Sequence, residues 1–75
     1  MTGLKYIVIN DRDMEIPILF HQCVQHRDIA GRLSDNVVSA GFWDGQKASG
    51  ESVGLKLKSR AEDTDLISRA IQFTL

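Results

Sequence analysis

The chain has 75 residues, of which 43% are hydrophobic and 25% charged, and its formal net charge at pH 7 is -1. This length predicts a single domain, residues 1–75, with a small core. The charge gives no general attraction to nucleic acid or anionic lipid, and the apolar runs are far shorter than the ~20 residues of a membrane span. Cys23 is the only cysteine, which excludes an intrachain disulfide. Residues 1–5 do not read as a secretory signal, so we expect a cytoplasmic protein.

Two strands are predicted at the start of the chain. Residues 4–9 are β-branched and aromatic, with apolar side chains on both alternating faces, which is typical of a strand covered on both sides. After polar residues 10–13, apolar and other residues alternate from 14 to 20, which predicts a second strand paired with the first as a hairpin. Pro17 has no N–H, so the second strand should lie at an edge of the sheet.

The middle of the chain predicts a short helix followed by two strands. The helix is expected from His26 or Arg27 to Leu33, limited to about two turns by Gly31. Residues 37–43 predict the third strand, and residues 44–50 a flexible polar loop. Strict alternation of Val53, Leu55 and Leu57 with polar residues predicts a half-buried fourth strand.

The last element is a predicted helix. Ser59 and Glu62 have the S-x-x-E spacing of a capping box, in which each side chain accepts from a backbone N–H of the first turn. An apolar stripe follows at positions 66, 67, 70 and 71. The expected fold class is therefore α+β, with element order ββαββα and a mainly antiparallel sheet that carries its helices on one face.

Residues 50–54 read GESVG, the G-x-S-x-G pattern of serine hydrolases. In those enzymes the serine lies between a strand and a helix, and its histidine comes later in the chain. Here a strand is expected after Ser52, and both histidines precede it. We interpret Ser52 as structural and expect no catalytic residue, hence no enzyme.

His21, Cys23 and His26 offer three metal-ligating side chains in one segment. Structural zinc needs four ligands, usually as two spaced pairs, and there is no second pair. We expect Cys23 to pack as a small apolar residue, and we expect neither a metal nor a cofactor.

Lys56, Lys58 and Arg60 alternate along the expected fourth strand and its exit, so they would share one face. Such a stripe is a candidate for contact with phosphate or nucleic acid. Because no aromatic residues for stacking on bases accompany it, an ordinary solvated face is favoured.

Phe42 and Trp43 are neighbours in the third strand and should point to opposite faces. Phe42 shares its position in the alternation with Val38 and Ala40, so we expect Phe42 in the core and Trp43 at the surface. Trp43, with Asp44 beside it, is then a candidate partner-binding residue. The alternative is that Trp43 covers the open side of the sheet.

Residues 37–42 (VVSAGF) and 50–63 (GESVGLKLKSRAED), with the opening YIV at 6–8, resemble a group of small phage and prophage proteins of unassigned function. That group shares a SAGF strand, a GES turn and a KSR-x-ED helix start, where x is often proline and here is Ala61. The resemblance covers roughly the C-terminal half of the chain. It implies a viral or prophage gene and no particular activity.

These observations favour a non-enzymatic interaction module that binds a partner protein or a second copy of itself. One alternative is a nucleic-acid accessory protein that uses Lys56, Lys58 and Arg60. Another is a small hydrolase built around Ser52.

Overall fold

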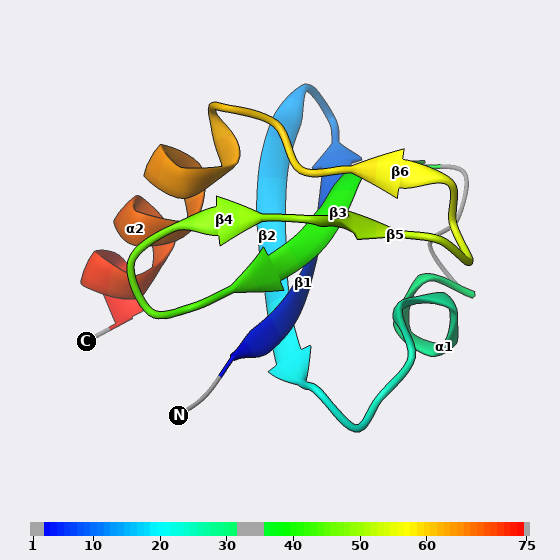
Figure 1. Cartoon of the computed structure of the whole chain (residues 1–75). Coiled ribbons are helices and arrows are strands. Elements are labelled where there is room, and N and C mark those ends of the chain that lie inside the picture. Colours follow the sequence, from blue (N-terminus) through cyan, green and yellow to red (C-terminus); the bar gives the residue numbers. More distant parts are fainter. Residues whose placement is uncertain (1–2, 32–35, 75) are drawn as a thin grey trace.

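The computed structural model describes residues 3–31 and 36–74 (Figure 1). Its elements in chain order are β1 (Leu4–Asp11), β2 (Met14–His21), α1 (His26–Ala30), β3 (Val37–Trp43), β4 (Ala48–Ser49), β5 (Glu51–Ser52), β6 (Leu57–Lys58) and α2 (Asp63–Thr74). Four strands form an antiparallel sheet in the order β2-β1-β3-β4, and β5 pairs with β6 in a small second sheet. The predicted α+β class is confirmed.

The first two strands form the predicted hairpin. Arg12 and Asp13 join them with φ angles of 53° and 67°, and two positive φ angles are what a two-residue type I′ turn requires. The register runs from Leu4↔His21 to Asp11↔Met14. Pro17 therefore lies in the edge strand, as its missing N–H predicts.

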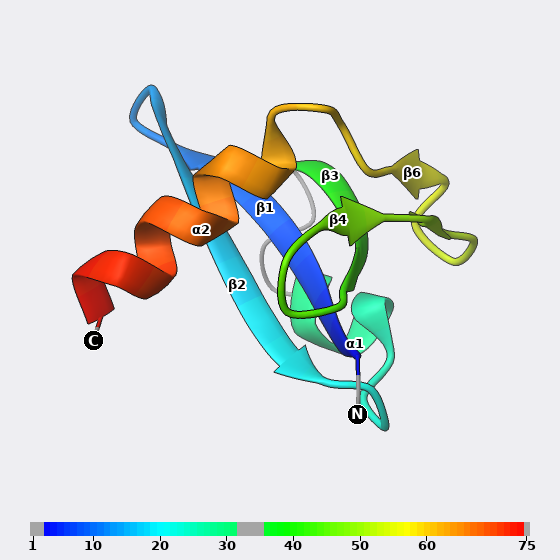
Figure 2. The same cartoon turned by 60° about the vertical axis from the view of Figure 1, so that its left-hand side comes forward.

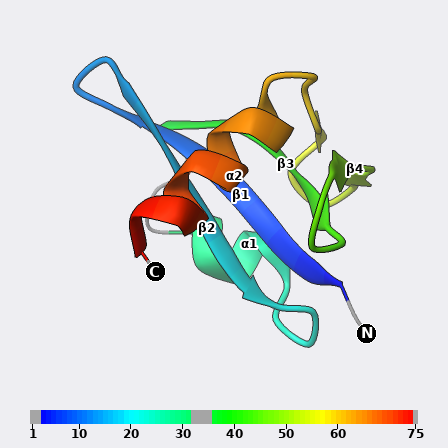
Figure 3. The same cartoon turned by 90° about the vertical axis from the view of Figure 1, so that its left-hand side faces the viewer.

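β1 is a central strand that is covered on both faces. Tyr6, Ile7 and Val8 are fully buried although neighbouring side chains of a strand point to opposite sides. Tyr6 and Val8 pack in one core with residues of α2, and Ile7 packs in another with Ala30 of α1. The two helices thus lie on opposite faces of the sheet (Figures 2 and 3). The expectation that both share one face is wrong, because β1 supplies two apolar faces and each needs a cover.

The expected burial of Phe42 and Trp43 is also wrong. Trp43 is 4% exposed in the core beneath α2, whereas Phe42 is 41% exposed. Pairing moves from Val8↔Ser39 to Ile9↔Val37, so Val38 is the extra residue of a β-bulge and does not share the face of Phe42. With both faces covered, the alternation alone does not decide which aromatic residue is buried.

The fourth strand predicted from Val53 to Leu57 is not a strand. Residues 53–56 form a turn between β5 and β6, closed by the Lys56 N–H donating to the Val53 carbonyl at 3.3 Å. Lys56 has a φ of 59°, outside the extended range of a strand. Leu55 and Leu57 still pack against the core beside α1, whereas Val53 is exposed, so the alternation marks burial at two of its three apolar positions and is wrong about the local structure.

α1 begins at His26, as predicted, and its expected end at Leu33 lies outside the described residues. α2 begins at Asp63, so the predicted capping box of Ser59 and Glu62 lies before the first residue of the helix. The Asp63 carboxylate accepts from the backbone N–H of Arg60 at 2.9 Å. Neither of these helices is long and apolar enough to cross a membrane.

A buried polar network ties the start of α2 to the β1–β2 hairpin. The Tyr6 hydroxyl donates to the fully buried Asp63 carboxylate at 2.6 Å. Arg60 donates from Nε to Asp63 at 2.9 Å and, through both terminal nitrogens, to Glu15 at 3.0 Å. Arg60 thereby links two carboxylates that lie far apart in the chain, which fixes α2 over its face of the sheet.

Candidate functional site

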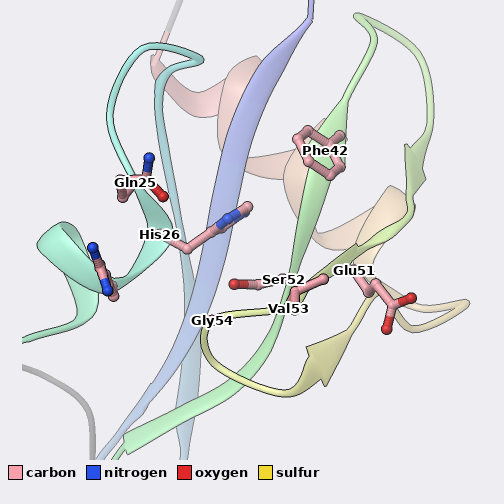
Figure 4. Close-up of a pocket in the computed structure, with 8 residues that line it drawn as sticks. Gln25, His26, Phe42, Glu51, Ser52, Val53 and Gly54 are labelled. Carbon is pink, nitrogen blue, oxygen red and sulfur yellow. The ribbon is translucent and has the colours of Figure 1, made fainter.

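A pocket of about 340 Å³ lies between the start of α1 and the β5–β6 turn (Figure 4). This volume is at the lower end of the range of about 300–1,000 Å³ that is usual for ligand pockets. The pocket takes its lining from three separate parts of the chain: Gln25, His26, Arg27, Phe42, Glu51, Ser52, Val53 and Gly54.

The walls of the pocket include two exposed apolar side chains. Val53, in the β5–β6 turn, is 82% exposed, and Phe42, at the end of β3, is 41% exposed. Gly50 lets the Phe42 ring lie against the main chain, because a Cβ at this position would come within 2.8 Å of the ring. Gly50 also has a φ of 78°, which favours glycine. The first glycine of GESVG therefore shapes the wall of the pocket.

His26 holds α1 against the sheet beside the pocket. Its ring is buried, with Nε2 2.8 Å from the Gly41 carbonyl oxygen. A carbonyl only accepts, so Nε2 carries the proton. The ring makes edge-to-face contacts with Phe20 and Phe42, both at a centroid separation of 5.5 Å. His26 thus fixes the Phe42 ring, which also lines the pocket.

Arg27 and Glu51 give the pocket charges of opposite sign. Arg27 comes from α1 and Glu51 from β5, and both are exposed. The pocket therefore combines the apolar side chains of Phe42 and Val53 with polar groups that include the opposite charges of Arg27 and Glu51. Protein interfaces likewise surround apolar contacts with polar ones.

Ser52 lies in the same pocket as His26, a proximity that the sequence did not reveal because these residues are far apart in the chain. The Ser52 side chain is nearly buried, and its hydroxyl accepts from the Leu55 N–H at 3.3 Å. In the described part of the chain, no hydrogen bond joins Ser52 to His26, whose Nε2 is bound to a main-chain carbonyl. A turn follows Ser52, instead of the helix of a nucleophile elbow.

We expect a serine-reactive fluorophosphonate to leave Ser52 unmodified. Ser52 is 3% exposed, and its hydroxyl oxygen accepts a hydrogen bond from the Leu55 N–H. The hydroxyl is therefore not an activated nucleophile. The measurement is the intact mass of the protein after labelling. A stable adduct at Ser52 that is lost in His26→Ala would instead assign a Ser–His pair and favour the hydrolase alternative.

Trp43 and Asp44 do not line the pocket. Trp43 is a core residue, and the Asp44 carboxylate accepts from the N–H groups of Gln46 and Lys47, each at 2.8 Å. The Gln46 N–H and then the Lys47 N–H hold the pKa of Asp44 below its usual value. Both residues therefore have structural roles. Trp43 was expected to be an exposed anchor for a partner, but it is buried.

The basic stripe expected from Lys56, Lys58 and Arg60 does not form. Lys56 lies in a turn and Lys58 in β6, and both are exposed. The Arg60 guanidinium is committed to Glu15 and Asp63 at 3.0 and 2.8 Å. Of the three residues, the two lysines have exposed side chains that a partner could contact. They do not lie along one strand, because Lys56 is in a turn and Lys58 is in β6.

His21 and Cys23 are exposed and His26 is buried, so the expectation that Cys23 packs as a small apolar residue is wrong. His21 is exposed, and its Nδ1 accepts from the Cys23 N–H at 3.0 Å, whereas His26 is buried against Gly41. Within residues 3–31 and 36–74, no three His, Cys, Asp or Glu side chains are grouped to hold a metal ion.

Comparisons with protein-family models, curated proteins and solved structures found no match. The resemblance to small phage and prophage proteins therefore rests on the sequence segments alone and stays a prediction.

Proposed function

We propose that this protein is a non-enzymatic interaction module that binds a partner protein by accepting one of its apolar side chains in the pocket beside α1. One observation carries the proposal. Four large apolar side chains are exposed among the described residues, and two of them, Phe42 and Val53, line the same pocket. Apolar side chains that converge on a pocket are typical of the centre of a protein interface.

The surrounding residues suit a protein partner. Arg27 and Glu51 line the pocket with opposite charges and are exposed, so they suit the polar rim that surrounds an apolar anchor. His26 holds the Phe42 ring in place through its edge-to-face contact, which limits the side-chain entropy lost on binding. Because this wall is already ordered, a partner's side chain could enter the pocket without a large rearrangement of the protein.

Binding of nucleic acid is the weaker alternative. It depends on Lys56, Lys58 and Arg60, and Arg60 is engaged by two carboxylates of this chain. A phosphate would have to displace those ion pairs. A phage or prophage origin and a cytoplasmic location stay as further parts of the proposal that derive from the sequence.

We expect Val53→Asp to weaken partner binding without unfolding the protein. Val53 is 82% exposed, and substitutions at such positions usually change the free energy of unfolding by less than about 0.5 kcal/mol. A carboxylate in the apolar wall should weaken binding about tenfold or more, which corresponds to about 1.4 kcal/mol. The measurement is affinity capture from nuclease-treated lysate of the source organism, read by mass spectrometry.

Gln46→Asp is the matched control, because it adds the same charge at an exposed loop position that does not line the pocket. A protein captured by wild type and Gln46→Asp but lost with Val53→Asp is the expected result. Equal capture by Val53→Asp contradicts the proposed site. Loss of all captured proteins on nuclease treatment contradicts the protein-binding function and favours the nucleic-acid alternative.

A further inference from the structure

β2 forms a long edge of the main sheet. It has 8 residues, whereas β4 at the opposite edge has 2. Residues 16–20 (IPILF) are apolar and only half-buried, and among the described residues no strand pairs with their outer side. A long apolar edge strand is a template for pairing with another strand unless something blocks it.

The type I′ turn determines which backbone groups of β2 point to this free edge. In such a turn the Asp11 carbonyl accepts from the Met14 N–H, so Asp11↔Met14 is a hydrogen-bonded pair. Hydrogen-bonded and non-hydrogen-bonded pairs alternate along an antiparallel ladder. The backbone groups at positions 15, 17, 19 and 21 therefore face outward, and Pro17 offers a carbonyl there but no N–H.

We propose that two copies of this chain associate through their β2 edges, antiparallel, about a two-fold axis at Ile18. The two four-stranded sheets then become one continuous sheet. This surface lies on a different element from the pocket beside α1, so the inference goes beyond the proposed partner binding and does not depend on it.

The position of Pro17 selects this register. With the axis at Pro17, the two prolines face each other and neither donates. With the axis at Leu19, Pro17 faces His21 of the second copy and Glu15 has no partner within the strand. With the axis at Ile18, the Leu19 N–H of each copy donates to the Pro17 carbonyl of the other. This register also pairs Glu15 with His21 at both ends.

The side chains match in the same register. On one face, Glu15 lies opposite His21 of the second copy. The His21 Nδ1 accepts from the Cys23 N–H, so Nε2 carries the proton and can donate. Both oxygens of Glu15 already accept from Arg60 at 3.0 Å, but each carboxylate oxygen has a second acceptor position that His21 could use. On the other face, Ile18 meets its own copy and Ile16 meets Phe20, which are favourable apolar cross-strand pairs.

The pairing closes on itself. Because the same strand is used by both copies, the interface is isologous. Among the described residues, the outer edges of the joined main sheet are then the two-residue β4 strands. A dimer of this kind covers the apolar edge and does not extend into a filament. The long edge therefore needs no further protection against aggregation.

Two measurements test the dimer. Sedimentation equilibrium of the wild-type chain should give a concentration-dependent mass that approaches twice the 8.4 kDa of one chain. Oxidation of Ile18→Cys in a Cys23→Ser background should then give a covalent dimer. Non-hydrogen-bonded pairs have Cα atoms about 4.5 Å apart, within the range of about 4.4–6.8 Å that a disulfide requires.

Ile16→Cys in the same background is the matched control. In this register two such residues are four positions out of alignment, or about 13 Å apart, and should form covalent dimers at least about tenfold more slowly. A wild-type chain that stays monomeric over the concentration range overturns the proposal. So does faster crosslinking of Pro17→Cys or Leu19→Cys than of Ile18→Cys. Val53→Asp should remain dimeric, which separates this result from that of partner binding.

Discussion

Asp63→Ala is expected to lower the free energy of unfolding by about 3 kcal/mol or more, because removal of one member of a buried ion pair leaves the other without a partner. The Asp63 side chain is fully buried and accepts from the Tyr6 hydroxyl at 2.6 Å and from Arg60 Nε at 2.9 Å. A domain of this length is stable by only about 4–11 kcal/mol. The loss should be measured by urea unfolding.

Glu62→Ala is the matched control for Asp63→Ala. Glu62 also pairs with Arg60, but at 3.7 Å and with an exposed side chain. Exposed pairs contribute about 0–1 kcal/mol, so this variant should unfold close to wild type. Similar losses in the two variants would contradict the role assigned to the buried network.

The same network sets an acid dependence. Burial alone would raise the pKa of Asp63, but hydrogen bonds from Tyr6 and the Arg60 N–H outweigh it and hold the pKa below its usual value. A lowered folded-state pKa contributes stability that is present above the unfolded value of about 3.9 and is lost as pH falls through the folded value. Asp63→Asn should therefore lose less of its free energy of unfolding than wild type as pH falls from 5 to the acid transition. The difference in this loss should correspond to the titration of about one carboxylate.

Trp43→Ala is expected to cost about 3–5 kcal/mol of stability, the usual range for removal of a buried Trp. Trp43 packs with Tyr6, Val8 and Ile67 between the sheet and α2, and it is 4% exposed. From the sequence, the same variant is expected to lose binding and keep its fold. Thermal unfolding followed by circular dichroism distinguishes the two expectations.

Trp43→Phe serves as the control, because it keeps an aromatic ring and most of the buried area. It should recover at least half of the stability that Trp43→Ala loses. A Trp43→Ala protein that unfolds like wild type would place this side chain at the surface and contradict the packing described above.

The three long strands could be predicted because their signals are local. A strand that is apolar on both faces and an alternating segment, separated by a polar turn, specify the β1–β2 hairpin, and Pro17 specifies its edge position. The strand from 37 to 43 has the predicted bounds. Its bulge at Val38 is set by pairing with β1, which no local pattern in the strand reveals.

The errors arise where distant parts of the chain decide the outcome. Val53, Leu55 and Leu57 alternate like a strand, yet two of them reach the core from a turn and from a two-residue strand. Arg60 reads as a surface cation until Glu15, from the other end of the chain, is placed beside it. The pocket combines residues of α1, β3 and β5, so its composition follows only from the tertiary structure.

The most direct test of the proposed function is selection of peptides from a random display library against the wild-type chain, followed by amide chemical-shift mapping of a selected peptide. We expect the selected peptides to share an apolar anchor residue, to cause shift changes centred on Arg27, Phe42 and Val53, and to lose binding in Val53→Asp. Peptides that bind Val53→Asp equally well, or shift changes centred away from this pocket, would contradict the proposed function.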